Sequence, residues 1–232
     1  SPMSDRRSDV QATRMAGLDL AGEVRALIAD VNRSAPDVDA LEAARALVVA
    51  ARAALDSPAR RRWYAVPLDE IDEDTTIRLR EEAGDHSLFR GGRNPLAPPL
   101  RVSTTVDSDG EPVVVGEVRL DRSREGPPQR VHGGMVAGLF DDVLSGAPGL
   151  VDAGPVVTGR LSVRYRRPTP LGVDLRFEAR VVRHSGRRLV ARARCIAPTD
   201  DGGTEVTAEA EALFIGIPRR AQDGAADPAD EG

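Results

Sequence analysis

The chain has 232 residues, a formal net charge of −5 and 41% hydrophobic residues. This length predicts one large domain, or one domain with an extension, and the hydrophobic content is enough for a core. The acidic balance argues against a general nucleic-acid-binding protein, and all 32 basic residues are arginine, a residue suited to binding phosphates and carboxylates.

Cysteine usage and hydropathy narrow the protein class further. A single cysteine, Cys195, excludes an internal disulfide and a cysteine-based metal cluster, which fits a reducing compartment. The sequence contains no run of about 18 apolar residues and no signal-type segment. It also lacks metal-ligand spacing and a phosphate-binding glycine motif. We therefore expect a cytoplasmic protein without a membrane span, a metal or a redox cofactor.

The N-terminal part predicts a helical extension over residues 18–60. Residues 1–17 are polar and unpatterned, and we expect them to be disordered or derived from a tag. A first helix has apolar residues at steps of three or four from Leu20 to Val31. A second helix starts after Pro36-Asp37 and has one apolar face, formed by Leu41, Ala44, Val48, Ala51 and Leu55. These apolar faces need cover, either from their own domain or from a partner subunit.

A predicted linker over residues 61–91 is acidic and then rich in glycine and proline. After it, the apolar period changes to two, which indicates strands over 101–106, 112–120, 155–166, 172–184, 187–198 and 204–217. Only one helix, at about 133–146, interrupts them. This order predicts an α+β domain over residues 92–218, with one antiparallel sheet wrapped around that helix. Residues 219–232 are expected to form a disordered tail.

The predicted central helix opens unusually, with Gly133 and Gly134, although each glycine costs about 1 kcal/mol against alanine in a helix. Glycines here leave the backbone N–H groups of the positive helix end open to an anion or a developing oxyanion. One face of the helix is apolar and suits a sheet. The other face consists of small residues around one carboxylate, so a backbone or ligand can come close: Gly134, Gly138, Asp141 and Ser145.

Two blocks of the sequence resemble hotdog-fold acyl-CoA thioesterases, in particular the phenylacetyl-CoA-thioesterase-like and THEM-type branch. They are "EGPPQRVHGGMVAGLFDDVLSG" (125–146) and "VVTGRLSVRYRRPTPLG" (156–172). The family pattern of His-Gly-Gly, six residues and then Asp is matched by 132–134 and Asp141, and its Thr or Ser on the next strand is matched by Thr158. The likeness covers roughly residues 92–217 and implies a hotdog fold.

The resemblance also implies hydrolysis of an acyl-CoA thioester, with coenzyme A as part of the substrate. The Gly133 N–H would polarise the thioester carbonyl, next to Gly134. Asp141 would act either as general base on water or as nucleophile, and Thr158 would hold the water or the carboxylate. For His132 we expect a capping and orienting role rather than base catalysis. If the site needs the side-chain amide that some relatives carry before the histidine, Gln129 is the only candidate.

Several residues leave alternatives open. Asp142 is the rival carboxylate, but the family spacing selects Asp141. Arg160, Arg164 and Arg166 alternate along one strand and either meet the phosphates of coenzyme A or form a solvated face. We interpret Cys195 as a packed thiol, and His86 and His184 as loop residues. The alternative functions are a hotdog acyl-thioester dehydratase or hydratase, and a non-catalytic acyl-CoA-binding regulatory module.

The helix itself predicts the assembly. Asp141 lies 141 − 133 = 8 residues beyond Gly133, which is about 12 Å along the axis at about 1.5 Å per residue. One straight helix therefore cannot hold both groups near one carbonyl. We expect a homodimer or a dimer of dimers with shared sites, in which two such helices pack antiparallel through the face of Gly134, Gly138 and Ser145.

Overall fold

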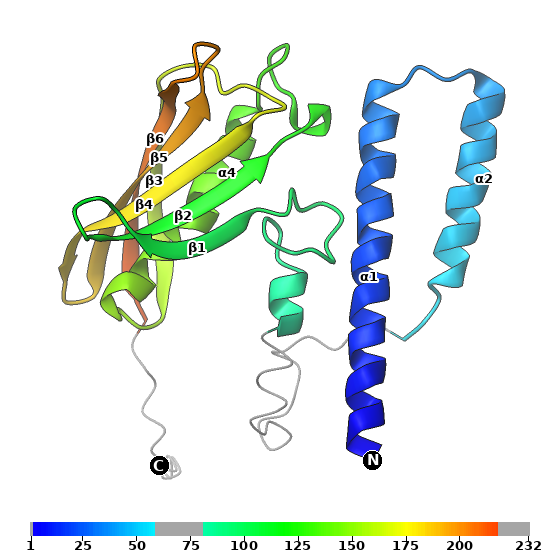
Figure 1. Cartoon of the computed structure of the whole chain (residues 1–232), viewed down its shortest axis with the longest axis horizontal. Helices are drawn as coiled ribbons and strands as arrows, with labels where there is room; N and C mark the ends of the chain where they lie inside the picture. Colours follow the sequence, from blue (N-terminus) through cyan, green and yellow to red (C-terminus); the bar gives the residue numbers. More distant parts are fainter. Residues whose placement is uncertain (1, 59–80, 218–232) are drawn as a thin grey trace, which may run out of the picture.

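The computed structural model describes residues 2–58 and 81–217, with side chains from residue 8 onward (Figure 1). The predicted tail over 219–232 and most of the predicted linker over 61–91 lie outside the described residues. The helices are α1 (Pro2–Arg33), α2 (Val38–Ala54) and α4 (Gly133–Leu144), with two 3-10 turns, η3 (Arg122–Arg124) and η4 (Ala147–Val151).

Six strands form one antiparallel sheet in the order β1-β2-β4-β5-β6-β3. They are β1 (Arg101–Val106), β2 (Pro112–Arg119), β3 (Val156–Tyr165), β4 (Asp174–Ser185), β5 (Arg188–Pro198) and β6 (Thr204–Gly216). Each differs from its predicted range by at most two residues at either end. Although β3 is third in sequence, it pairs with β6 and forms one edge of the sheet, so that β1 and β3 are the two edge strands (Figure 1).

The core lies between this sheet and α4, which runs across β2, β3, β4, β5 and β6. The predicted apolar face of α4 is fully buried, and the ring of Phe140 meets that of Phe177 of β4 edge-on, with centroids 5.1 Å apart. The helix comes so close to β2 that a Cβ at Gly116 would lie 2.5 Å from a methyl group of Val143. The predicted α+β hotdog arrangement, one sheet around one helix, is confirmed.

One expectation about the N-terminus is wrong: residues 2–17 are not disordered but continue α1, which has 32 residues. The Arg14 guanidinium pairs with Asp85 at 2.7 Å, and Gly17 approaches Arg93 so closely that a Cβ there would lie 2.6 Å from it. Once one turn of a helix is anchored, each further residue adds a hydrogen bond at little entropic cost. No proline lies between Pro2 and Pro36 to stop the helix.

The second predicted helix is α2, capped at its start by Asp37, whose carboxylate accepts the Ala40 N–H at 2.9 Å. It runs beside α1 in the opposite direction (Figure 1), yet none of its residues is buried. Across the described part of the chain, no helix is both long and apolar enough to cross a membrane.

Candidate active site

The N-terminus of α4 is capped by His132. This residue has extended backbone angles (φ −60°, ψ 133°), and its Nδ1 accepts the Gly134 N–H at 3.0 Å. Its own N–H donates to the Arg124 carbonyl at 2.9 Å, which ties the approaching loop to η3. The predicted capping role of His132 is confirmed.

Capping leaves one N–H group open. The N–H groups of His132 and Gly134 are both engaged, and that of Met135 donates to the His132 carbonyl at 2.9 Å. Among the described residues, the Gly133 N–H has no acceptor. The two glycines therefore differ: Gly134 uses its N–H for the cap, while Gly133 presents a free donor at the positive end of the helix.

Tyr165 is a neighbour of this donor to which the sequence pattern assigned no role. Its hydroxyl donates to the Gly133 carbonyl at 2.7 Å, and a Cβ on Gly133 would lie 3.3 Å from the same oxygen. The tyrosine is 53% exposed at the end of β3. Tyr165 thus attaches the edge strand β3 to the first turn of α4. In the sequence, the only indication of this role was its position in the block 156–172 that resembles the thioesterases.

Near its other end, α4 presents Asp141 to the beginning of β3. The Thr158 hydroxyl donates to the Asp141 carboxylate at 3.1 Å. A β-bulge makes this contact compatible with the core, because the pairing of β3 with β6 skips Gly159. As a result both Thr158 and Leu161 face α4, although they are an odd number of residues apart. The structure brings the predicted pair Asp141 and Thr158 together.

The rival carboxylate is held by an arginine. Arg90 donates from Nε to the Asp142 carboxylate at 2.5 Å and from Nη2 to the Asp142 carbonyl at 2.6 Å. The same Nη2 lies 3.3 Å from the Ser145 hydroxyl. Asp142 therefore anchors the segment that leads into β1. No local pattern in the sequence pointed to Arg90, because it lies 52 residues away in the predicted linker.

The small face of α4 is also partly covered by its own chain. A Cβ on Gly138 would lie 2.4 Å from the ring of Phe89, and Ser145 is engaged by Arg90. Phe89 thus occupies space beside Gly138 that a second α4 would need, whereas Ser145 is exposed, so the expected packing of two α4 helices through Gly134, Gly138 and Ser145 stays a prediction. Gly138 has no side chain where the ring of Phe89 lies.

The three candidate phosphate-binding arginines are not near the Asp141 carboxylate. Leu161 and Val163 pack on the core, so Arg160 and Arg164, which alternate with them, point to the opposite face of the sheet. Arg166 follows the strand and pairs with Glu209 at 2.7 Å. Arg160 lies 4.0 Å from Glu211.

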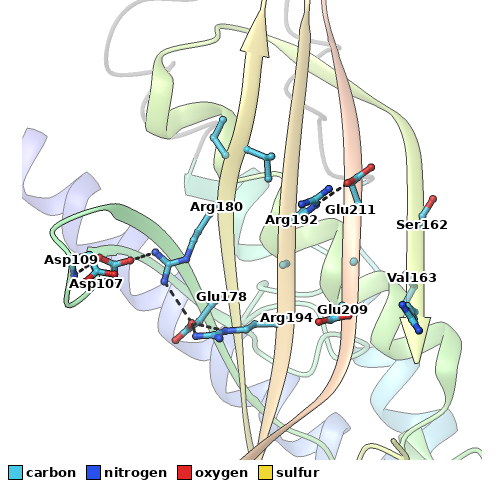
Figure 2. A pocket seen from close by; sticks show the side chains of 15 residues that line it. Asp107, Asp109, Ser162, Val163, Glu178, Arg180, Arg192, Arg194, Glu209 and Glu211 are labelled. Atoms are coloured by element: carbon cyan, nitrogen blue, oxygen red, sulfur yellow. Dashed lines mark hydrogen bonds and ion pairs between the residues drawn. The ribbon is translucent and has the colours of Figure 1, made fainter. Parts of the chain in front are cut away.

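That opposite face is hollowed, with a volume of about 1000 Å³ lined mainly by alternating arginines and carboxylates. Figure 2 shows these side chains projecting from neighbouring strands, with Arg192 paired to Glu211 and Arg194 to Glu178. Burial disfavours the charged form of Glu178, but hydrogen bonds from Arg176 and Arg194 outweigh it and lower the pKa of this carboxyl. Most charges on this face are thus matched within the sheet.

The remaining reactive side chains lie apart from Asp141. Cys195 is fully buried in β5, and burial raises the pKa of its thiol to about 11, so the prediction of a packed thiol is confirmed. His184 is exposed at the end of β4 rather than in a loop. Within residues 8–58 and 81–217, no group of three His, Cys, Asp or Glu side chains could hold a metal ion.

Comparison with known proteins agrees with this geometry. The family model described as "Thioesterase superfamily" matches residues 129–204, which contain the α4 N-terminus, Asp141 and Thr158. The chain is 36% identical over 91 residues to the acyl-coenzyme A thioesterase THEM4 of Xenopus laevis. That match spans 39% of each protein.

A solved structure extends the likeness beyond this segment. The crystal structure of a thioesterase superfamily protein superposes with a TM-score of 0.63 at 29% sequence identity. The superposition covers 86% of this chain and 94% of the chain in that crystal structure. The sheet around one central helix is thus a hotdog-like fold, and it is similar to the fold of the thioesterase superfamily protein.

Proposed function

We propose that this chain hydrolyses an acyl-CoA thioester to a free acid and coenzyme A. The observation that carries the proposal is that the two adjacent carboxylates, Asp141 and Asp142, have different partners. Asp142 is neutralised by Arg90, whereas Asp141 receives, from the described residues, one hydrogen bond, donated by the neutral hydroxyl of Thr158. A half-buried carboxylate with one neutral partner keeps lone pairs for a proton or an acyl carbon.

The reaction needs a base, an oxyanion donor and water. With Asp141 as base, it removes a proton from water while the water oxygen attacks the thioester carbon. The carbonyl oxygen becomes an oxyanion, which the free Gly133 N–H and the positive helix end stabilise. The carbon–sulfur bond then breaks, and the thiolate of coenzyme A takes the proton back from Asp141. Direct attack by Asp141, through an anhydride that water then cleaves, uses the same residues.

The other predicted site residues act through these two. His132 holds the first turn of α4 by accepting the Gly134 N–H, which leaves only the Gly133 donor for the oxyanion. Thr158 fixes the orientation of the Asp141 carboxylate, or of the water beside it. The contact of Arg160, Arg164 and Arg166 with the phosphates of coenzyme A stays a prediction.

Two copies of the chain are needed for one such site. Gly133 and Asp141 are about 12 Å apart along α4, whereas both must lie about 3 Å from one carbonyl group. The edge strand β3 supplies the geometry, because Thr158 near its beginning contacts Asp141. At its end, Tyr165 contacts Gly133.

If β3 pairs antiparallel with the β3 of a second copy, the beginning of one strand meets the end of the other. This pairing carries Asp141 of one chain toward Gly133 of the partner subunit. It also extends the sheet through its β3 edge, whose outward N–H and C=O groups have no strand partner among residues 2–58 and 81–217. Unlike a contact between two α4 helices, it does not require Phe89 to leave Gly138.

The first test compares the two carboxylates in a thiol-release assay with short, long and aromatic acyl-CoAs. Asp141→Asn keeps the size of the side chain but removes the base, so kcat falls by at least about 10²-fold. Asp142→Asn is the matched control and retains most of the turnover. Near-wild-type hydrolysis by Asp141→Asn would refute the assignment.

The second test addresses the shared site. Gly133→Pro removes the N–H and adds a ring at a first-turn position where proline is tolerated, and His132 already has the extended angles that a following proline requires. Gly133→Ala is the control, since it adds a Cβ against Tyr165 but keeps the donor. Mixing the inactive Gly133→Pro and Asp141→Asn proteins restores activity after subunit exchange, because one site of each heterodimer has both groups. Heterodimers that form but stay inactive contradict the shared site.

A further inference from the structure

A small cavity with a basic wall lies where α1 packs against η3. Its volume is about 90 Å³, and its polar lining comes from Arg25 of α1, Arg119 at the end of β2, and Asp121, Ser123 and Arg124 in and beside η3. Three prolines of the 95–99 segment complete the wall, and their fixed backbone angles make it rigid. Since about 10–15 Å³ of such space holds one water molecule, the cavity has room for one phosphate group.

Backbone carbonyls, rather than carboxylates, hold two of these arginines in place. Arg25 donates from Nη1 to the carbonyls of Gly92 and Asn94 at 3.0 and 3.1 Å, and Arg124 donates from Nη2 to the Leu96 carbonyl. Neither arginine forms an ion pair with any residue that the structure describes. A guanidinium has five N–H donors, so each group is oriented by these contacts but keeps its charge and further donors for a ligand.

The carboxylate beside the cavity is already engaged. Asp121 accepts the backbone N–H of Ser123 at 2.9 Å and also its hydroxyl at 2.5 Å. Arg119 lies 3.5 Å from Asp174, but both side chains are mostly exposed, and such a pair neutralises little. Three arginines and one carboxylate give the wall a formal charge of +2. On the outer face of the sheet most charges are matched, whereas this cavity lacks a doubly charged anion.

The cavity adjoins the start of α4, where the proposed oxyanion donor lies. Arg124 lines the cavity with its side chain, and its backbone carbonyl accepts the His132 N–H at 2.9 Å. Gly133 is the next residue. A substrate that places its carbonyl at Gly133 can therefore reach the cavity through a flexible arm. Arg160 and Arg164, in contrast, point to the face of the sheet opposite α4.

We propose that this cavity binds the 3′-phosphate of coenzyme A, with Arg25 and Arg124 as its main donors. The identity of the ligand rests on the proposed function. The 3′-phosphate is a terminal monoester with a charge of about −1.5 to −2 at pH 7, which matches both the charge of the wall and the space for one phosphate. The diphosphate of coenzyme A is esterified at both ends and needs a longer cavity. Guanidinium forks suit phosphate oxygens, so α1 would contribute a substrate contact.

Calorimetric titration of the full chain with coenzyme A tests the cavity without hydrolysis. Arg124→Gln removes the charge but keeps an amide donor for the Leu96 carbonyl, and it weakens binding at least about tenfold, as does Arg25→Gln. The matched control is Arg183→Gln, which removes an exposed arginine of β4 that has no ion pair in the described part of the chain. It changes Kd by less than about twofold. Equal affinities of the wild type and Arg124→Gln overturn the proposal, and so does a loss seen only in Arg164→Gln.

Truncated ligands identify the group that binds. 3′-Dephospho-coenzyme A lacks only the 3′-phosphate, so it binds the wild type at least about tenfold more weakly than coenzyme A. Arg124→Gln then changes its affinity by less than about twofold. Equal losses for the two ligands in Arg124→Gln are inconsistent with the 3′-phosphate in the cavity. A free nucleotide is the other source of such a phosphate: ADP that binds through Arg124 without competing with coenzyme A would reveal a separate site and overturn the proposal.

Steady-state kinetics separates substrate binding from support of α4. With an acyl-CoA, Arg124→Gln raises KM about tenfold and leaves kcat within about twofold, because a phosphate far from the reacting carbonyl contributes equally to the ground state and the transition state. With an acyl-pantetheine, which has no nucleotide, the variant matches the wild type. A lower kcat with both substrates would mean that Arg124 only supports the start of α4. An inactive chain that still binds coenzyme A through Arg124 contradicts the proposed function but not this site.

Discussion

Replacing Gly138 with alanine tests whether Phe89 really covers the small face of α4. The new Cβ would lie 2.4 Å from the far end of the Phe89 ring, and ordinary contact begins at 3.4 Å, so the ring must retreat by about 3.4 − 2.4 = 1.0 Å. Overpacking of this size costs about 1–3 kcal/mol. Alanine recovers about 1 kcal/mol of helix propensity, so we expect a net destabilisation of about 1 kcal/mol.

The sign of this effect should reverse when Phe89 is absent. Phe89→Ala alone lowers the free energy of unfolding by about 2–4 kcal/mol, somewhat less than the loss of a fully buried ring, because Phe89 is only half-buried. In that background nothing obstructs the new methyl group, and Gly138→Ala stabilises the protein by about 1 kcal/mol. The coupling between the two positions is therefore about 2 kcal/mol.

Urea unfolding of the wild type, both single variants and the double variant gives the four free energies required. Unchanged m-values confirm that only stability has changed. If Gly138→Ala stabilises the wild type as much as it stabilises Phe89→Ala, the ring does not cover α4. The small face would then be open to a second α4, as the sequence pattern suggested.

Three further predictions follow from the charges and the thiol. Asp142→Asn breaks the ion pair with Arg90 and lowers the free energy of unfolding by about 1–2 kcal/mol in urea titration, while kcat stays within about threefold of the wild type. A loss of turnover as large as that of Asp141→Asn would contradict the assignment of Asp141 as the catalytic carboxylate. The hydrogen bond from Arg14 lowers the pKa of Asp85, so its contribution to docking α1 is complete above a pH of about 4 and is lost as the pH falls through the lower folded-state value. Hydrogen exchange in α1 should therefore accelerate, beyond its intrinsic pH dependence, as the pH falls below about 4, an effect that Asp85→Asn removes. Because burial raises the pKa of Cys195 to about 11, a thiol reagent at about pH 8 labels it only after denaturation; rapid labelling of the folded chain would show that β5 opens locally.

Local patterns in the sequence predicted most of the fold. The apolar period of two located all six strands, and the period of three to four located α2 and α4, because each period marks which residues one face of an element buries. The spacing from His132 to Asp141 lies within one helix, so the cap and the position of the carboxylate on the helix followed from sequence alone. The N-terminal segment was misjudged because an unpatterned polar stretch still extends a helix that is anchored farther along.

Contacts between distant segments were decided only by the tertiary structure. Arg90 pairs with Asp142 and not with Asp141, although it lies 52 residues away in the sequence. Phe89 covers Gly138, from which it is separated by 138 − 89 = 49 residues. Neither leaves a periodic signal, because a side chain from a loop needs only one small partner or one opposite charge. The bulge at Gly159, which turns Thr158 toward Asp141 and Arg160 away from it, depends on pairing with β6. The sequence thus determined which groups are on each element, and the packing of the elements decided which of them meet.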